Sequence, residues 1–318
     1  MRTEIAILFV AGGGSALLCA VLLPLLKKLH AGQYILGYVR EHMDKSGTPT
    51  MGGLAFVCAA ALCAIPFGLY ADRHVAVAVT FGCAYAAVGF LDDFLKLRRR
   101  RNLGLRAYQK ILFQFAVALL AGLYCYSADL TVLNIPFVGR SVDVGGWIIP
   151  LAAFAFVATT NCVNLTDGLD GLAASTCFWY FAALSALTFL LSGEEGLLLA
   201  RLGLILCGVL AGYLIFNTHR ASVFMGDTGS LGLGGFAAAM AAFGGNLLYI
   251  AVIGVMFVCS GISVILQVIY YKKTKKRLFR MAPLHHHLQK LGYSESKIAY
   301  MYSLITASAG LLCLAFAM

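Results

Sequence analysis

The chain has 318 residues and a formal net charge of +10, and 61% of its residues are apolar while only 12% are charged. This composition excludes an ordinary soluble globular protein and leaves no room for long disordered stretches. The ten cysteines stand in or beside apolar segments with no Cys-x-x-Cys pair. They are therefore expected to be small packing residues, and neither a disulfide framework nor a zinc site is expected.

Windows of mostly apolar residues recur along the whole chain. We place ten of them, at residues 4–26, 52–70, 75–91, 111–127, 147–163, 173–191, 200–216, 231–245, 247–270 and 297–317. Most are long enough to cross a hydrocarbon core, and their runs are continuous, which favours helices over a barrel. The sequence predicts an all-α polytopic membrane protein with about ten transmembrane helices in a single domain over residues 1–318. Between two windows, residues 127–146 alternate apolar and polar side chains, which predicts a small hairpin.

The basic residues indicate how these helices are oriented. The loops on one side hold 20 of the 24 Lys and Arg residues, and the other side keeps only Arg2, Arg73, Arg140 and Arg201. The richer side is expected to be cytoplasmic, which puts both termini outside. Part of the net charge is then explained by topology in a lipid bilayer, and no nucleic-acid partner is expected. The basic clusters at residues 98–101 and 272–277 fit topology signals and binding of anionic headgroups or a phosphorylated substrate equally well.

Acidic side chains gather at the cytoplasmic ends of the predicted helices. Asp92 and Asp93 close the third helix beside Lys96, in the string FLDDFLK. Two hard oxygen donors beside an ammonium group suit Mg²⁺ and a phosphate, and an aspartate pair that simply ends a helix fits this stretch equally well. Asp227 lies in the glycine-rich string FMGDTGSLG, where backbone amides and a helix N-terminus favour an anion. This position suits a metal ligand, although a helix start capped by Thr228 or Ser230 also fits the string, and the GK[ST] ending of a P-loop is absent.

Asn164, Asp167 and Asp170 stand three residues apart between two apolar windows, in the string NCVNLTDGLDGLA. On a helix, residues i, i+3 and i+6 fall close to one face, so the three side chains are expected to converge on one ligand. Carboxylates near membrane depth indicate a functional site. The spacing alone suggests that this site binds a metal.

Other polar stretches are less specific. His285, His286 and His287 precede the last window, and successive helical residues point about 100° apart, so the three rings cannot bind one metal together. Hydrogen bonds to a pyrophosphate and a structural role in the loop both fit them. Lys45, in the string DKSGTPTMGG, can meet a phosphate or a base carbonyl. Gln267 is an isolated amide in the ninth window, which a simple interhelical hydrogen bond would also explain.

The strings DKSGTPTMGG, FLDDFLK, NCVNLTDGLDGLA, FMGDTGSLGLGG and MAPLHHHLQ, in this order, resemble those of the polyprenyl-phosphate N-acetylhexosamine-1-phosphate transferase superfamily. Within it, the MAP-x-HHH string is similar to the phospho-N-acetylmuramoyl-pentapeptide transferase family, because relatives that transfer N-acetylglucosamine-1-phosphate usually carry a different histidine motif there. The resemblance covers nearly the whole chain. Two positions depart from the family pattern: Gln289 stands where glutamate is common, and Tyr300-Met301-Tyr302 replaces a stretch close to Arg-Phe-Trp.

The resemblance implies transfer of phospho-MurNAc-pentapeptide from UDP-MurNAc-pentapeptide to undecaprenyl phosphate, which yields lipid I and UMP with Mg²⁺ in the bacterial cytoplasmic membrane. It implies that Asp92, Asp93 and Asp227 bind the metal and act in catalysis with Lys96 and His286. These carboxylates suffice for one Mg²⁺. The resemblance implies that the segment NLTDGLDGL, with Asn164, Asp167 and Asp170, lies at the uridine end, where Phe224 is available to stack on uracil. The residues expected to bind substrate are Lys45, Thr50, Asn164, Asp167, Asp170, Asn217, Phe224, Ser230, Gln267, His285 and His287.

Several alternatives stay open at this point. A transferase that uses UDP-N-acetylglucosamine shares the chemistry, and a transporter of a lipid-linked sugar would also explain many helices and a basic face. The transfer can proceed through a phospho-aspartyl enzyme or by direct attack of the lipid phosphate. A phosphate monoester with a second pKa of about 6 is mostly dianionic at neutral pH, which favours direct attack. The oligomeric state is open, with a homodimer among the alternatives.

Overall fold

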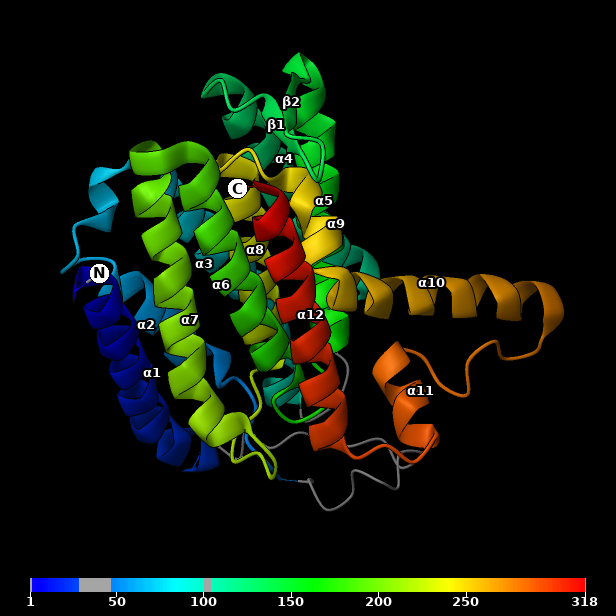
Figure 1. Ribbon diagram of the computed structural model, residues 1–318. Helices are drawn as coiled ribbons and strands as arrows, with labels where there is room; N and C mark the ends of the chain where they lie inside the picture. The colour runs from blue at the N-terminus through cyan, green and yellow to red at the C-terminus, as the bar shows by residue number, and fades with distance from the viewer. Residues whose placement is uncertain (1, 29–46, 100–103, 318) are drawn as a thin grey trace.

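The computed structural model describes residues 2–28, 47–99 and 104–317, and within them the chain is helical apart from one hairpin and its connecting turns (Figure 1). A helix lies within each of the ten predicted windows, which confirms the all-α prediction. The elements are α1 (Arg2–Lys28), α2 (Gly53–Cys63), α3 (Arg73–Arg99), α4 (Ala107–Ser127), β1 (Val132–Ile135), β2 (Arg140–Asp143), α5 (Ile148–Thr166), α6 (Leu172–Ser192), α7 (Leu197–Asn217), α8 (Gly226–Phe243), α9 (Ile250–Ile253), α10 (Val255–Thr274), α11 (Leu284–Lys290) and α12 (Glu295–Ala317).

The apolar helices make this chain a multi-pass membrane protein. Seven segments of the described residues are long and apolar enough to cross a membrane, and one of them covers α6 and α7 together. Helix α2 has only 11 residues, so it is much shorter than the window predicted for it. Helix α8 begins at Gly226, ahead of its predicted window. The number of ten spans therefore stays a prediction.

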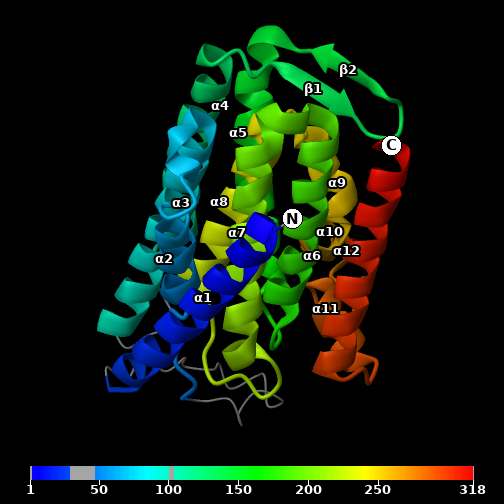
Figure 2. The same cartoon turned by 60° about the vertical axis from the view of Figure 1, so that its left-hand side comes forward.

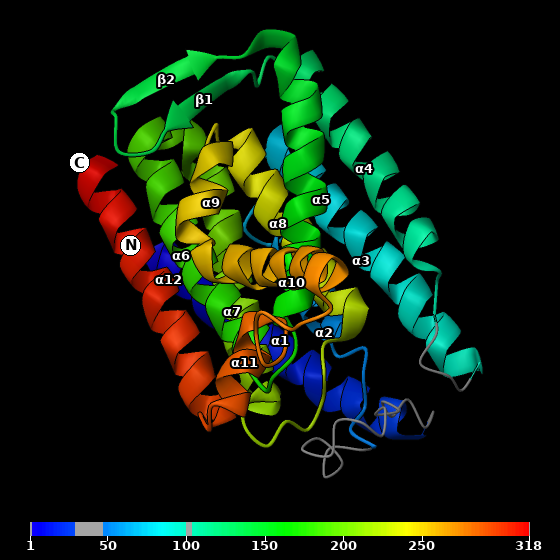
Figure 3. The same cartoon turned by 90° about the vertical axis from the view of Figure 1, so that its right-hand side faces the viewer.

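The ninth predicted span is wrong as a single continuous helix. Residues 247–270 break at Gly254, which separates the short α9 from α10. A side chain at Gly254 would overlap with the ring of Phe257, so the chain can pack this tightly only with glycine. Beyond the break, α10 leaves the bundle and lies across the direction of α12, as Figures 1 and 3 show. The apolar run therefore does not follow the other helices through the bundle.

Helix α8 occupies the centre of the bundle. Residues 228–243 are all buried, and α3, α5 and α2 pack around them. Small residues allow this close packing, because a β-carbon at Gly89 of α3 or Gly234 of α8 would overlap with the backbone of Asp227 or Thr160. The close fit of α3 on α8 brings the acidic ends of the two helices together at one end of the bundle.

The predicted hairpin is present between α4 and α5. Strands β1 and β2 pair antiparallel, with Val132 opposite Asp143 and Ile135 opposite Arg140. It covers one end of the bundle, as Figure 2 shows. The acidic ends of α3 and α8 lie at the other end.

Both ends of the chain lie toward the hairpin. The ring of Phe316 in α12 packs edge-on against Phe137 in the hairpin turn, with the ring centroids 5.3 Å apart. Near the start of α1, Glu4 forms an ion pair of 2.9 Å with Arg201, which follows the turn between α6 and α7. The predicted placement of the termini on the same side as the hairpin fits this arrangement. Which side faces the cytoplasm stays a prediction.

Candidate active site

Three carboxylates meet at the end of the bundle opposite the hairpin. Asp92 and Asp93 come from the last turns of α3, and Asp227 comes from the first turn of α8. One oxygen of each lies within 4.8 Å of the other two. Asp92 and Asp93 are each only 3% exposed, so their charges are largely withdrawn from water. The structure thus brings together the three residues predicted as metal ligands.

Two glycines allow the carboxylates to approach one another. Gly226 begins α8 with a φ of +69°, a conformation that L-residues avoid. A β-carbon at Gly226 would also press on Asp93 Oδ2 and on Thr50 Oγ1. Gly89, one turn before Asp93, lies against the carbonyl group of Asp227. The site therefore depends on glycine where α3 and α8 meet, and Thr50 lies at its edge.

The protein fixes the orientation of the α3 carboxylates with neutral donors. Asp92 Oδ1 accepts the backbone N–H of Leu105 at 2.7 Å. Asp93 Oδ2 accepts the backbone N–H of Thr228 at 2.9 Å and the hydroxyl of the same residue at 2.7 Å. Because these donors hold one oxygen of each carboxylate, the other oxygen remains directed at the centre of the cluster.

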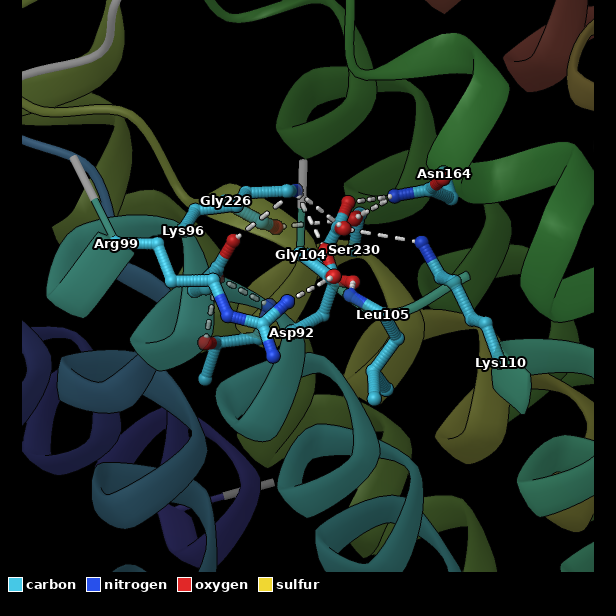
Figure 4. Close-up of polar contacts among 12 residues, drawn as sticks. Asp92, Lys96, Arg99, Gly104, Leu105, Lys110, Asn164, Gly226 and Ser230 are labelled. Atoms are coloured by element: carbon cyan, nitrogen blue, oxygen red, sulfur yellow. Dashed lines mark hydrogen bonds and ion pairs between the residues drawn. The ribbon is translucent and has the colours of Figure 1, made fainter. Parts of the chain in front are cut away.

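Two ammonium groups, those of Lys96 and Lys110, offset part of the negative charge of the three carboxylates, and Figure 4 labels both lysines. Lys96 Nζ lies 2.6 Å from Asp92 Oδ2, 3.6 Å from Asp93 Oδ1 and 2.8 Å from Asp227 Oδ2. Lys110 Nζ lies 2.9 Å from the same Asp227 oxygen. Hard carboxylate oxygens that converge in this way fit Mg²⁺, because a cation relieves the repulsion among them.

The contact between Lys110 and Asp227 was not predicted from the sequence. Apart from a match to a position of the family that the chain resembles, the sequence signal of Lys110 is that of a basic residue near the start of an apolar helix. Such a residue looks the same as one that merely sets membrane topology. The contact with Asp227 becomes visible only when α4 and α8 are packed together.

The prediction that Asn164, Asp167 and Asp170 share one helix face is wrong. Helix α5 ends at Thr166, so Asp167 already lies in the following turn. Gly171 then adopts a φ of +70° before α6 begins. The two Asp-Gly pairs in this string are turn signals, which outweigh the three-residue spacing.

Of these three residues, Asn164 joins the carboxylate cluster directly. Its amide nitrogen donates to Asp227 Oδ1 and to Ser230 Oγ, both at 2.7 Å. Asn164 therefore lies at the cluster and orients one of its carboxylates. Ser230, which the sequence also assigns to substrate binding, accepts a hydrogen bond from Asn164 (Figure 4).

Asp167 and Asp170 have separate surroundings. Asp170 is 4% exposed, and its Oδ2 accepts the backbone N–H of Ala221 at 3.1 Å and lies 3.6 Å from His219 Nδ1. Asp167 is partly buried, which raises the pKa of its carboxyl to about 8, and the nearby Asp227 carboxylate adds to the increase. Asp170 thus connects the turn after α5 to the loop before α8. Asp167 lies close enough to the cluster for the charge of Asp227 to raise its pKa.

The three histidines of α11 have separate partners, as the helical spacing predicts. His285 is fully buried, and its ring occupies the space that a β-carbon at Gly168 would need. His286 Nδ1 lies 2.7 Å from Gln289 Oε1, so Gln289 fixes one edge of this ring. His287 Nδ1 accepts a backbone N–H from the preceding loop at 3.1 Å. His285 therefore holds α11 against the turn after α5.

Asn217 and Gln267, both predicted to bind substrate, are engaged by nearby backbone. Asn217 Nδ2 donates to the carbonyl group of Val223 at 2.9 Å, and its Oδ1 accepts the backbone N–H of Gly171 at 3.2 Å. Gln267 Oε1 accepts the backbone N–H groups of residues 278 and 279, at 3.1 and 2.8 Å. These bonds order the loops around the site, and direct substrate contact by either side chain stays a prediction.

The backbone of Phe224 connects the loop before α8 to the start of α2. Its N–H donates to the carbonyl group of Pro49, and its own carbonyl accepts the N–H of Gly52, both at 2.8 Å. The Phe224 side chain is partly exposed, so stacking on a base is sterically open to it. Lys45, predicted to contact a phosphate, lies outside the described residues.

Comparison with known proteins places these residues in a family. Residues 75–245 match the family described as glycosyl transferase family 4, and residues 45–57 match a phospho-N-acetylmuramoyl-pentapeptide-transferase signature. The phospho-N-acetylmuramoyl-pentapeptide-transferase of Caldanaerobacter subterraneus subsp. tengcongensis is 43% identical over 290 residues, or 90% of each chain. Proteins of the same name are 38% identical in Clostridium botulinum strain Alaska E43, over 96% of this chain and 93% of the relative, and 40% identical in Clostridium perfringens strain SM101, over 92% and 90%.

The first matched range runs from α3 to the turn after α8, so it contains all three converging carboxylates. The relatives match nearly the whole chain at an identity well above the level at which families diverge in fold. The chain is therefore a membrane-embedded transferase that belongs to the phospho-N-acetylmuramoyl-pentapeptide-transferase family.

Proposed function

We propose that the chain transfers phospho-MurNAc-pentapeptide from UDP-MurNAc-pentapeptide to undecaprenyl phosphate, forming lipid I and releasing UMP. The observation that carries this proposal is the convergence of Asp92, Asp93 and Asp227 around Lys96 in a member of this family. We assign the protein to the bacterial cytoplasmic membrane, with the carboxylate cluster at the cytoplasmic face. There a water-soluble nucleotide can meet a lipid phosphate.

The carboxylate cluster is proposed to hold Mg²⁺ through Asp92, Asp93 and Asp227. When bound, the cation would neutralise the diphosphate charge and stabilise the departing UMP. The chain contributes pre-arranged groups, because the bonds from Leu105 and Thr228 already orient two of the carboxylates. Lys96 and Lys110 lie outside this ligand set, and their ammonium groups supply positive charge beside it.

Direct attack by the lipid phosphate is the proposed chemical step. A phosphate oxygen of the lipid forms a bond to the β-phosphorus of the nucleotide, while the bond from that phosphorus to the bridging oxygen breaks and UMP departs. The attacking phosphate is already mostly dianionic at neutral pH, so no strong base is required. The task of the protein is then to position two anions in line and to neutralise their charge.

Purified protein in detergent tests this proposal with two nucleotides. With undecaprenyl phosphate and Mg²⁺, UMP and a lipid-linked product are expected from UDP-MurNAc-pentapeptide and not from UDP-N-acetylglucosamine, as measured by chromatography. Omitting the lipid phosphate should abolish UMP release entirely, including any stoichiometric burst. Equal use of UDP-N-acetylglucosamine would contradict the substrate assignment, and a burst with labelled protein would contradict direct attack.

Asp170 is proposed to bind the uridine end of the nucleotide, away from the metal. The Asp170→Asn variant is expected to raise KM for the nucleotide roughly ten-fold, because a hydrogen bond to a charged acceptor contributes about 1.5–3 kcal/mol. The kcat and the Mg²⁺ concentration for half-maximal rate should change by less than about three-fold. A variant with an unchanged KM and a raised Mg²⁺ requirement would instead place Asp170 among the metal ligands.

A further inference from the structure

An amide pair, formed by the fully buried Gln114 and the partly buried Asn161, lies between α4 and α5 close to the carboxylate cluster. Asn161 Nδ2 donates to Gln114 Oε1 at 2.5 Å. Gln114 follows Lys110 by one helical turn on α4, and Asn161 precedes Asn164 by about one turn on α5. Lys110 and Asn164 both reach Asp227, at 2.9 and 2.7 Å. The amide pair therefore joins the same two helices that supply two of the contacts of Asp227.

Gln114 is the residue at which α4 becomes anchored in the bundle. Residues 107–113 are all partly or largely exposed, and Gln114 is the first buried residue of the helix. Its backbone carbonyl also accepts the hydroxyl of Tyr85 from α3, at 2.9 Å. The turn that carries Lys110 has no buried residue of its own. The position of Lys110 relative to α5 is therefore set largely at Gln114.

The amide pair is a poor source of stability. Among the described residues, Gln114 Nε2 is buried and donates no hydrogen bond. A buried donor without an acceptor is destabilising, and replacing both members of a buried polar pair by apolar groups of similar size is often neutral or stabilising. Replacing both amides by apolar side chains can therefore change the position of α4 against α5 without lowering the stability of the protein.

We propose that Gln114 and Asn161 are positioning residues for the transfer reaction. By holding α4 against α5, they place Lys110 Nζ and Asn164 Nδ2 on opposite oxygens of the Asp227 carboxylate. They touch neither substrate nor metal themselves. This inference rests on the proposed role of Asp227 in holding the cation.

The double variant that carries both Gln114→Leu and Asn161→Leu replaces both members of the pair by apolar groups, so it is expected to lower the rate without lowering the stability. The kcat is expected to fall roughly 10- to 100-fold, because small displacements of charged groups at a phosphoryl-transfer site have effects of this size. KM for the nucleotide should stay within about two-fold, and the Tm in detergent should be unchanged or higher. The exchanged pair, Gln114→Asn with Asn161→Gln, should recover most of the lost kcat. A parallel loss of Tm and kcat, or an unchanged kcat, would overturn the proposal.

A double-mutant cycle with Lys110→Met separates positioning from general packing. When the ammonium group is absent, Gln114→Leu has little left to misplace, so its further effect on kcat should be less than about three-fold. Fully additive losses would overturn the proposal. Asn246→Leu is the matched control: this amide is as fully buried as Gln114, but it bonds Thr188 and Asn134 at the hairpin end. It should lower the Tm without lowering kcat.

The two proposals fail in different ways. Retained activity in a variant that lacks the Asp227 carboxylate would remove the proposed metal site, and this inference with it. If that variant is inactive while the Gln114→Leu and Asn161→Leu double variant keeps full kcat, the positioning role alone is wrong.

Discussion

The Asp227→Ala variant is expected to lose UMP release by roughly 10³-fold or more. Asp227 is the shared acceptor of the Lys96 and Lys110 ammonium groups and of the Asn164 amide. Its removal leaves these three donors without their common partner and takes away one of three carboxylates proposed to hold Mg²⁺. Because the chemistry depends on charge neutralisation at fixed positions, no neighbouring group can compensate.

The measurement is kcat from UMP release at saturating nucleotide and lipid phosphate, together with the Tm in detergent. Asp143→Ala serves as the control, because this exposed carboxylate lies in the hairpin at the opposite end of the bundle. The control should keep full activity. If Asp227→Ala retained more than about a tenth of the kcat, the proposed metal site would have to be abandoned.

Among substitutions of uncharged residues, Gly89→Ala is expected to lower activity and stability the most. The new β-carbon would overlap with the carbonyl group of Asp227 and the amide nitrogen of Thr228. Both atoms are backbone in the first turn of α8, so neither can rotate aside. Helix α3 must move off α8, which is expected to cost about 1–3 kcal/mol in stability. Moving Asp93 away from Asp227 should lower kcat by roughly 100-fold.

Gly13→Ala is the matched control for Gly89→Ala. Gly13 also lies within a long apolar helix, yet a β-carbon there meets no atom within 4 Å. Alanine favours a helix over glycine, so the control should keep its activity and a Tm at least equal to that of the parent. Equal behaviour of the two variants would show that the contact of α3 with α8 does not control the geometry of the site.

The helices could be predicted from the sequence because the thickness of the membrane sets how many consecutive apolar residues a spanning helix needs. The hairpin followed from alternation, and the convergence of Asp92, Asp93 and Asp227 followed from the resemblance. The direction of α10 could not be predicted, because its apolar run reads like any other span. The break at Gly254 separates it from α9, and the direction in which α10 leaves the bundle is visible only in the folded structure (Figures 1 and 3).

The residues around the cluster were harder to assign than the cluster itself. Lys110 carries the same signal as a topology charge, and its partner lies 117 positions away in the chain. Asn164 was grouped with Asp167 and Asp170 by spacing, although the end of α5 at Thr166 separates them. Local sequence describes one helix at a time, whereas these contacts depend on how α4, α5 and α8 pack.

The enclosure of α8 bears on how the protein is made. Unlike the seven segments that qualify as spans, α8 is too weakly apolar to do so, since glycines, an aspartate and two hydroxyl residues take up much of it. It has no stretch that faces lipid, because residues 228–243 are all covered by other helices. Its neighbours α2, α3 and α5 precede it along the chain, so they are synthesised and inserted first. The segment that delivers Asp227 is thus held in the bilayer by helices already in place, so the carboxylate cluster can form only after α2, α3 and α5 have been inserted.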